Sequence, residues 1–184
     1  MILTDREIKL ALSKAQVTID PAPDEQAFSS TALDLTLDAT ARRFKTDVAA
    51  GVRLDPAHPN YRYHAVSGML TDEVTTQPEF NLESGILLLG WTREYVALPE
   101  SSRVAARVEG KSSLARLGVG VHITAPTIHA GFGGQIQLEI VNHGPAPVTL
   151  RAGMRICQLI FETTLGTPEK GYTGIFAGQT AGHT

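Results

Sequence analysis

The sequence predicts a mainly β domain, and three observations support this fold class. Short apolar segments recur at even spacing between residues 32 and 161, and glycine or proline separates them. Several of these segments alternate apolar with polar side chains, which is typical of half-buried strands. No long helical segment lies between them, as a parallel sheet would require. The pattern therefore favours an antiparallel sandwich, a jelly roll or a small barrel.

Length and composition predict one globular domain. The chain has 184 residues, enough to bury a core, and its net charge of -3 gives no overall basic signal for nucleic acid. Charges follow Met1 too early for a signal peptide, and no apolar stretch is long enough to span a membrane. We therefore expect a cytoplasmic protein without a nucleic-acid or membrane partner. Cys157, the only cysteine, excludes an internal disulfide and a thiolate cluster for zinc, and we expect it in the core.

The first elements are a helix and a strand, followed by a segment that is difficult to interpret. Thr4–Glu7 has the spacing of a capping box, so a helix is expected at about residues 5–14. Residues 32–37 alternate apolar with polar side chains and predict a strand. Residues 43–78 contain three prolines and show weak periodicity, which indicates a long excursion or a poorly paired hairpin. No function can be assigned to that segment from its residues.

Six more strands and a tail complete the expected order. The strands are expected at residues 85–92, 95–98, 104–108, 120–124, 135–141 and 154–161. Residues 170–184 are rich in glycine and aperiodic, so they predict a mobile tail. Tyr172 and Gln179 in this tail are either ordinary exposed residues or parts of a flap that closes over a bound nucleotide.

The stretch Gly110–Gly118 predicts a glycine turn and a helix of little more than one turn, which a second glycine ends. Ser112 or Ser113 is expected to cap this helix. Free N–H groups at a helix start favour anions, so a polyphosphate seat and a plain capped surface turn are both consistent with these residues. The phosphate loop of nucleotide hydrolases is disfavoured, because it requires glycine where Ala105 stands and because the helix is too short.

Glu139 and three histidines are the other candidates for chemistry. Glu139 lies on the polar face of the predicted strand 135–141, and the pattern alone favours a solvent-exposed glutamate over a catalytic one. If that face looked into a cleft, the carboxylate could transfer protons. His122, His129 and His143 lack the spacing of a zinc deaminase motif, so they are expected to be structural or surface residues.

Taken together, these segments resemble the trimeric dCTP deaminases of the dUTPase superfamily. The similarity covers most of the chain, is weakest over residues 43–78, and is most specific where Gly110–Gly118 is combined with Leu138 and Glu139. It implies one dCTP deaminase-like domain over residues 1–184, folded as a distorted jelly-roll β-barrel with a short N-terminal helix. It also implies a homotrimer with active sites shared between subunits and a flexible C-terminal flap over residues 170–184.

The resemblance implies hydrolytic deamination of dCTP to dUTP and ammonia, which would feed dUMP and dTTP synthesis. Glu139 would act as general base and then as general acid, while Ser112, Arg116 and the carbonyl of Ala125 would position the attacking water. The implied nucleotide-binding residues, with 111–116 as the triphosphate seat, are Lys111, Ser112, Ser113, Leu114, Ala115, Arg116, His129, Gln137, Leu138, Glu139, Gln158, Tyr172 and Gln179. Mg²⁺ would arrive with the triphosphate, no zinc would be bound, and dTTP would be a candidate inhibitor.

Two positions depart from the family pattern. Thr127 stands where many members carry arginine, and His129 stands where they carry an aspartate. A neutral histidine can accept a hydrogen bond from a sugar hydroxyl but lacks the fixed negative charge of aspartate. The substitution therefore argues against dUTP hydrolysis more than against deamination. The alternatives are a dUTP diphosphatase or bifunctional dCTP deaminase/dUTP diphosphatase, and a non-catalytic regulator that binds nucleotides.

Overall fold

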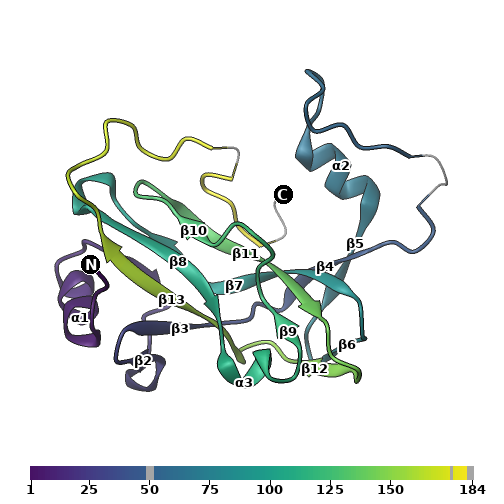
Figure 1. The fold of residues 1–184 in the computed structure, drawn as a ribbon, viewed down its shortest axis with the longest axis horizontal. Coiled ribbons are helices and arrows are strands. Elements are labelled where there is room, and N and C mark those ends of the chain that lie inside the picture. The colour runs from purple at the N-terminus through teal and green to yellow at the C-terminus, as the bar shows by residue number, and fades with distance from the viewer. Residues whose placement is uncertain (49–51, 175, 182–184) are drawn as a thin grey trace.

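The protein was analysed as a computed structural model that describes residues 1–48, 52–174 and 176–181 (Figure 1). One sheet contains β1 (Thr18–Asp20), β4 (Thr40–Phe44), β5 (Thr71–Thr75), β7 (Leu87–Ala97), β9 (Val119–Gly120) and β11 (Gly133–Asn142). The other contains β2 (Phe28–Ser29), β3 (Ala32–Thr36), β8 (Val104–Gly110), β10 (Thr127–Ile128) and β13 (Arg155–Thr163). A ribbon pairs β6 (Phe80–Leu82) with β12 (Val148–Leu150). The helices are α1 (Asp5–Ser13), α2 (Tyr63–Leu70) and α3 (Ser112–Ala115), with short 3-10 turns at Glu25–Ala27 and Glu100–Ser102.

The strand order confirms the predicted fold class. The first sheet runs β5-β4-β7-β11-β9 with β1 added beside β7, and the second runs β10-β8-β13-β3-β2. The pairs of strands are antiparallel, as the short connections predicted. The described strands form two sheets and a ribbon rather than one closed ring, which is a distorted jelly-roll arrangement.

The core lies between the sheets, and β11 shows how it is built. Successive residues of β11 alternate between half-buried and buried, so Ile136, Leu138 and Ile140 face the core. Phe161 on β13 is the largest side chain buried in it. Trp91 on β7 is also fully buried, but it pairs with Gln137 and so lies on the opposite face of the first sheet. Cys157 is fully buried as predicted, and burial raises the pKa of its thiol above the ordinary value.

The predicted strands at 85–92 and 95–98 are one strand, so the predicted break was wrong. β7 continues through Arg93 and Glu94 because the Glu94 carboxylate finds partners in the interior. Its oxygens accept hydrogen bonds from the Thr36 backbone N–H (2.9 Å) and from the Thr36 hydroxyl (2.6 Å). Satisfied in this way, a charged residue can occupy a buried strand position.

The predicted strand at 120–124 is also wrong beyond Gly120. β9 pairs with the end of β11 only at Val119 and Gly120. The chain then leaves the first sheet and crosses to the second, where β10 pairs with β8. Because of this crossing, residues 122–126 do not pair with β11, and a cavity remains between them and that strand.

Residues 43–78 hold a hairpin with a long connection, and the helix within it was not predicted. β4 and β5 pair in register from Thr40 opposite Thr75 to Phe44 opposite Thr71, so the hairpin is well paired at its base. The described residues of the connection, 45–48 and 52–70, form the excursion; it ends in α2, which projects from the edge of the sheet (Figure 1). Apolar residues without amphipathic spacing, and a glycine within the helix, explain why sequence periodicity did not reveal α2.

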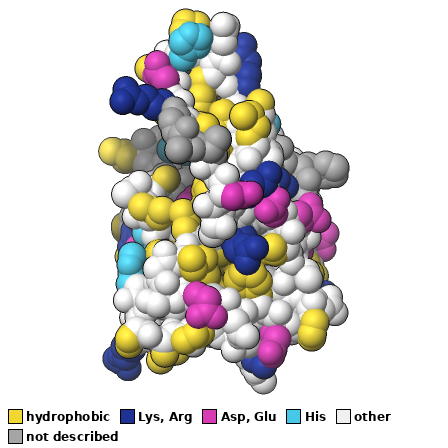
Figure 2. Space-filling view, turned by 90° about the vertical axis from the view of Figure 1, so that its right-hand side faces the viewer, with side chains coloured by type: hydrophobic (Ala, Val, Ile, Leu, Met, Phe, Trp, Pro, Cys, Tyr) yellow, Lys and Arg dark blue, Asp and Glu magenta, His cyan; other side chains and the backbone are white. Residues whose placement is uncertain are grey.

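At the N-terminus, α1 occupies Asp5–Ser13 and confirms the helix expected at 5–14. The Thr4 hydroxyl bonds the Glu7 side chain, whereas no side-chain hydrogen bond caps the helix backbone. The face of the molecule in Figure 2 carries acidic and basic side chains interspersed, without one continuous basic surface. In the described chain, no helix has the length and apolar character needed to cross a membrane.

Glu94→Leu is expected to destabilise the fold by about 2 kcal/mol, because the half-buried Thr36 N–H and hydroxyl lose their acceptor. Glu94→Gln retains an acceptor and should lose less. The control is Glu83→Leu at an exposed position, which should leave the free energy of unfolding within about 0.5 kcal/mol. Denaturant unfolding measures all three, and equal stability of Glu94→Leu and wild type would contradict the role assigned to this carboxylate.

Candidate active site

The predicted triphosphate seat forms the short helix α3 and the turn before it. α3 begins with Lys111 as its N-cap residue and is followed by Gly118 at a positive φ of 91°. Neither Ser112 nor Ser113 caps it, so that prediction was wrong: both lie inside the first turn with exposed side chains. The Arg116 side chain is exposed as well. Their hydroxyls and guanidinium form no side-chain hydrogen bond within the described chain.

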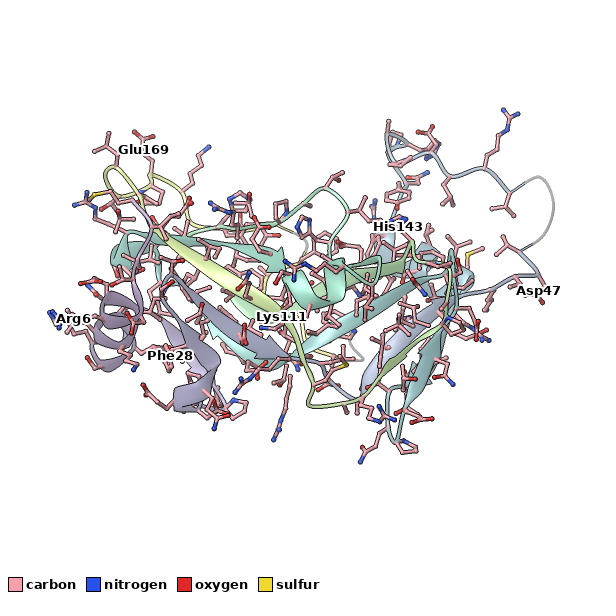
Figure 3. All side chains as sticks on the ribbon, turned by 60° about the horizontal axis from the view of Figure 1, so that its bottom comes forward. Arg6, Phe28, Asp47, Lys111, His143 and Glu169 are labelled. Carbon is pink, nitrogen blue, oxygen red and sulfur yellow. The ribbon has the colours of Figure 1, made fainter. Side chains whose placement is uncertain are left out.

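Lys111 and Gln158 have partners inside the subunit. Lys111 is labelled in Figure 3. Its ammonium lies 2.6 Å from the Asp34 carboxylate, and both side chains are largely buried. Gln158 on β13 donates a hydrogen bond from its Nε2 to the Gly110 carbonyl at 3.2 Å. These contacts hold the turn before α3 in place. Within one subunit, Lys111 and Gln158 therefore stabilise the predicted triphosphate-binding segment, and their side-chain groups are already paired.

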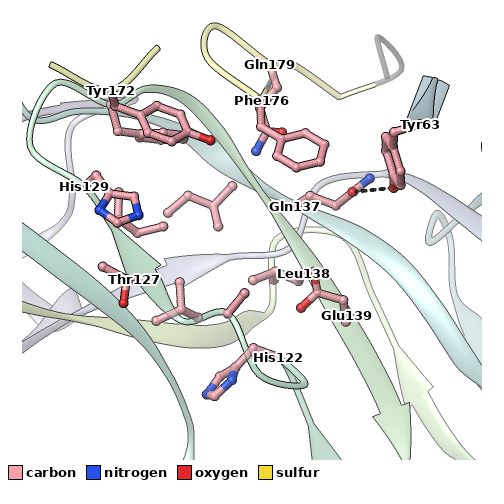
Figure 4. Close-up of a pocket in the computed structure, with 15 residues that line it drawn as sticks. Tyr63, His122, Thr127, His129, Gln137, Leu138, Glu139, Tyr172, Phe176 and Gln179 are labelled. Carbon is pink, nitrogen blue, oxygen red and sulfur yellow. Dashed lines mark hydrogen bonds between the residues drawn. The ribbon is translucent and has the colours of Figure 1, made fainter. Parts of the chain in front are cut away.

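A cavity of about 320 Å³ lies elsewhere, between β11, the β9–β10 crossing and the C-terminal tail (Figure 4). Seven predicted site residues line it: Ala125, His129, Gln137, Leu138, Glu139, Tyr172 and Gln179. The other described residues around it are Tyr63, Val108, His122, Thr127, Ile128, Phe132, Ile136 and Phe176. Residues 111–116 and Gln158 are absent from this lining, so one subunit does not bring the two halves of the predicted site together.

Glu139 faces this cavity because of its place on β11. The strand buries its even-numbered residues in the core, so Gln137 and Glu139 project from the opposite face. The crossing segment lies across the cavity from that face, and the Ile123 N–H donates to Glu139 Oε2 at 3.4 Å. The alternation alone favoured a solvent-exposed glutamate; the structure places it in a cleft because residues 122–126 leave the sheet.

His129 and Tyr172 form the wall of the cavity nearest the tail. Their rings are stacked with centroids 5.5 Å apart and an interplanar angle of 14°, and Phe132 packs against Tyr172 at 6.0 Å. His122 also lines the cavity, and its buried Nδ1 has no hydrogen-bond partner within the described chain. Two of the three histidines expected to be structural or surface residues therefore border the candidate site.

The tail lies directly against β11 and the turn before it. Gln135 N–H donates to the Gln179 carbonyl, and Gln179 Nε2 donates to the Gln135 carbonyl, each at 2.9 Å. A Cβ on Gly131 would lie 2.6 Å from the Tyr172 backbone nitrogen, so only glycine allows this approach. The tail thus borders one side of the cavity. Its action as a mobile flap stays a prediction, and residues 175 and 182–184 lie outside the described residues.

Three aromatic residues of the lining were not identified from the sequence. Phe132 and Phe176 were not singled out, and Tyr63 lies in the excursion to which no function could be assigned. The Tyr63 hydroxyl donates to Gln137 Oε1 at 3.2 Å, and its ring meets Phe176 edge to face at 5.2 Å (Figure 4). The one signal available was a cluster of tyrosine and histidine in a segment otherwise rich in turn residues.

Comparisons with known proteins agree with this geometry. The family model described as dCTP deaminase-like matches residues 2–164, so the chain belongs to that family. The chain is 40% identical over 172 residues to a "dCTP deaminase, dUMP-forming" of Methanothermobacter thermautotrophicus, covering 93% of this chain and 83% of the relative. It is 38% identical over 172 residues to a dCTP deaminase of Rhodospirillum rubrum, covering 94% of this chain and 87% of the relative.

A solved structure supports the same assignment. The crystal structure of the 2'-deoxycytidine 5'-triphosphate deaminase from Agrobacterium tumefaciens superposes with a TM-score of 0.68 at 25% identity. The match covers 88% of this chain and 48% of that one, so the present chain spans about half the length of that deaminase. The expected membership of the dCTP deaminase family is confirmed. Within the described residues, no three His, Cys, Asp or Glu side chains gather as metal ligands.

Gly131→Ala is expected to displace the tail, because the new methyl group would overlap the Tyr172 backbone. Trypsin should then cleave after the exposed Lys170 about tenfold faster or more, as overpacking of 1–3 kcal/mol implies. Gly153→Ala is the matched control, since Gly153 also has a positive φ (80°) but open space around its Cβ position. Equal cleavage rates in the two variants would show that the close approach at Gly131 does not hold the tail.

Proposed function

We propose that this protein hydrolyses dCTP to dUTP and ammonia. The observation that carries the proposal is Glu139, a carboxylate on the paired strand β11 that faces the cavity opposite the Ala125 segment. The names of the relatives from M. thermautotrophicus and R. rubrum support the substrate. The product would enter dUMP and dTTP synthesis, and the protein would work in the cytoplasm.

Glu139 would catalyse the reaction by moving protons. It would take a proton from a water molecule whose oxygen attacks C4 of cytosine, which gives a tetrahedral intermediate. It would deliver that proton to N3 of the ring and then transfer the remaining proton of the attacking oxygen to the amino nitrogen, so that the C4–N bond breaks, ammonia leaves and the C4 carbonyl forms. The Ala125 carbonyl, which borders the same cavity, would help to orient the water, and Gln137 and Leu138 would contact the base.

A complete site requires a second subunit in this proposal. Glu139 and the tail line the cavity, whereas Ser112, Ser113 and Arg116 lie outside it with exposed side chains. A homotrimer would place α3 of one subunit at the cavity of the next. The α3 N–H groups and Arg116 would then hold the triphosphate, and Mg²⁺ would arrive with the nucleotide rather than in a protein cage.

The lining favours deamination without cleavage of the triphosphate. Glu139 is the one carboxylate among the described residues around the cavity, and His129 lies where a second carboxylate would be needed to activate water at the α-phosphate. The alternative is a bifunctional enzyme, which the "dUMP-forming" name of the M. thermautotrophicus relative keeps open. A nucleotide-binding regulator without turnover is the second alternative.

Product analysis distinguishes these functions. Purified protein is incubated with Mg²⁺ and either dCTP or dUTP, and ammonia, dUTP, dUMP and pyrophosphate are measured. Ammonia and dUTP without pyrophosphate support the deaminase; pyrophosphate from dUTP supports the diphosphatase or bifunctional enzyme. Tight binding of dCTP without any product supports the regulator. Adding dTTP to the dCTP reaction tests whether it inhibits.

Glu139→Gln is expected to bind dCTP with near-normal affinity but to release ammonia at least about a hundredfold more slowly, because the general base is lost. The side chain keeps its size and can still accept a hydrogen bond from Ile123. Steady-state ammonia release and calorimetric titration with dCTP measure the two effects. Near-normal turnover would remove Glu139 from the proposed mechanism.

Mixing two inactive variants tests the shared site. Arg116→Ala and Glu139→Gln should each abolish most activity, but coexpressed subunits should regain about a quarter of wild-type turnover. In a randomly assembled ring, one site in four joins an intact Glu139 to an intact neighbouring Arg116. If each site were contained within one subunit, no mixture would recover activity.

A further inference from the structure

We propose that Tyr63 is a positioning residue of the deamination site, which joins the excursion between β4 and β5 to both the β11 strand and the C-terminal tail. This inference rests on the proposed function. Neither the residue pattern nor the resemblance assigned any role to this segment. The structure places Tyr63 at the first residue of α2 and on the wall of the cavity that contains Glu139.

The first contact runs through the Tyr63 hydroxyl. It donates to Gln137 Oε1 at 3.2 Å, across 74 positions of sequence. Gln137 lies two residues before Glu139 on the same face of β11, so this bond acts on the side chain next to the reacting carboxylate. A long amide side chain has several rotamers, and a fixed acceptor partner restricts it to one of them.

The direction of the hydrogen bond also determines what Gln137 offers to a ligand. With its oxygen occupied by the Tyr63 hydroxyl, the amide presents only its N–H₂ group as a donor. Gln137 Nε2 is buried and has no partner within the described chain. A buried donor without an acceptor costs about 1–3 kcal/mol, so an acceptor atom of a bound pyrimidine nucleotide would relieve that cost.

The second contact runs through the ring. Tyr63 meets Phe176 edge to face, with centroids 5.2 Å apart and an interplanar angle of 85°. Aromatic pairs of this geometry contribute beyond simple burial. Phe176 belongs to the tail segment between Tyr172 and Gln179, so α2 holds the tail at a point between its two predicted nucleotide contacts (Figure 4).

The environment keeps Tyr63 in the form that can donate. Burial raises the pKa of the phenol above its ordinary value, and the nearby Glu139 carboxylate raises the pKa further. The hydroxyl therefore stays protonated throughout the range in which enzymes of this kind are assayed. It can serve as a hydrogen-bond donor to Gln137 without competing for the proton that Glu139 transfers.

Three variants separate the two contacts. Tyr63→Phe removes the hydroxyl and keeps the ring, whereas Tyr63→Leu and Phe176→Leu each remove one ring of the aromatic pair. Tyr61→Phe is the matched control, because Tyr61 lies in the same excursion, loses the same hydroxyl and does not line the cavity. The measurements are kcat and KM for dCTP, the thermal midpoint, and the rate of tryptic cleavage after Lys170.

Tyr63→Phe is expected to raise KM for dCTP about 3- to 10-fold with kcat within about twofold, the effect of one neutral hydrogen bond. Its thermal midpoint and tail cleavage should match wild type. Tyr63→Leu loses both contacts, so it should show the same rise in KM and also about 3- to 10-fold faster cleavage, whereas Phe176→Leu should show the faster cleavage. In the Tyr63→Leu/Phe176→Leu double variant the tail should be cleaved no faster than in Tyr63→Leu, since the two rings act as a pair.

Two results would overturn the inference. If Tyr63→Phe and Tyr61→Phe have the same KM, the hydroxyl does not position the site. If Tyr63→Leu leaves tail cleavage unchanged, the ring does not hold the tail. Failure of the proposed function is distinguished by wild-type protein that releases no ammonia from dCTP; calorimetric dissociation constants for dCTP in the same variants then replace KM in the comparison.

Discussion

The pairing of β11 with β7 is the constraint on which the candidate site depends. Successive residues of a strand face opposite sides, so the register that buries Leu138 also places Glu139 on the other face. A shift of one residue in register would exchange the two, placing an unpaired carboxylate in the core, and that cost fixes the register. The position of the catalytic candidate is thus determined by the hydrophobic core rather than by any polar contact of its own.

The features that could be predicted from the sequence are those that depend on residues close together in the chain. Local patterns identified the N-terminal helix, the four longest strands and the α3 turn, because periodicity and glycine placement report on nearby residues. They did not identify the short strands β1, β2, β4, β5, β6, β10 and β12. They missed the continuity of β7 through Glu94, since the acceptor role of that carboxylate depends on Thr36, 58 residues away. They also missed α2 and Tyr63. The contact between Tyr63 and Gln137 joins distant segments and leaves no local signature.

The candidate site was likewise predicted only in part. The family resemblance identified Glu139, His129, Tyr172 and Gln179, and the fold gathers these residues around one cavity. It also grouped them with residues 111–116, which the single subunit keeps outside that cavity. Sequence motifs do not record which subunit a residue comes from, so a set of residues can be correct for an assembly while remaining separate in one chain. Lys111 illustrates the difference, because its buried ion pair with Asp34 makes it part of the scaffold within the subunit.

The excursion between β4 and β5 is a segment in which substitutions and length changes cost little folding free energy. Both strands pair at the edge of their sheet, so the connection between them can lengthen, shorten or exchange residues without altering the core. That same connection supplies a wall of the cavity through α2. A substitution in this connection can therefore change the lining of the cavity while the paired strands that carry Glu139 stay in place.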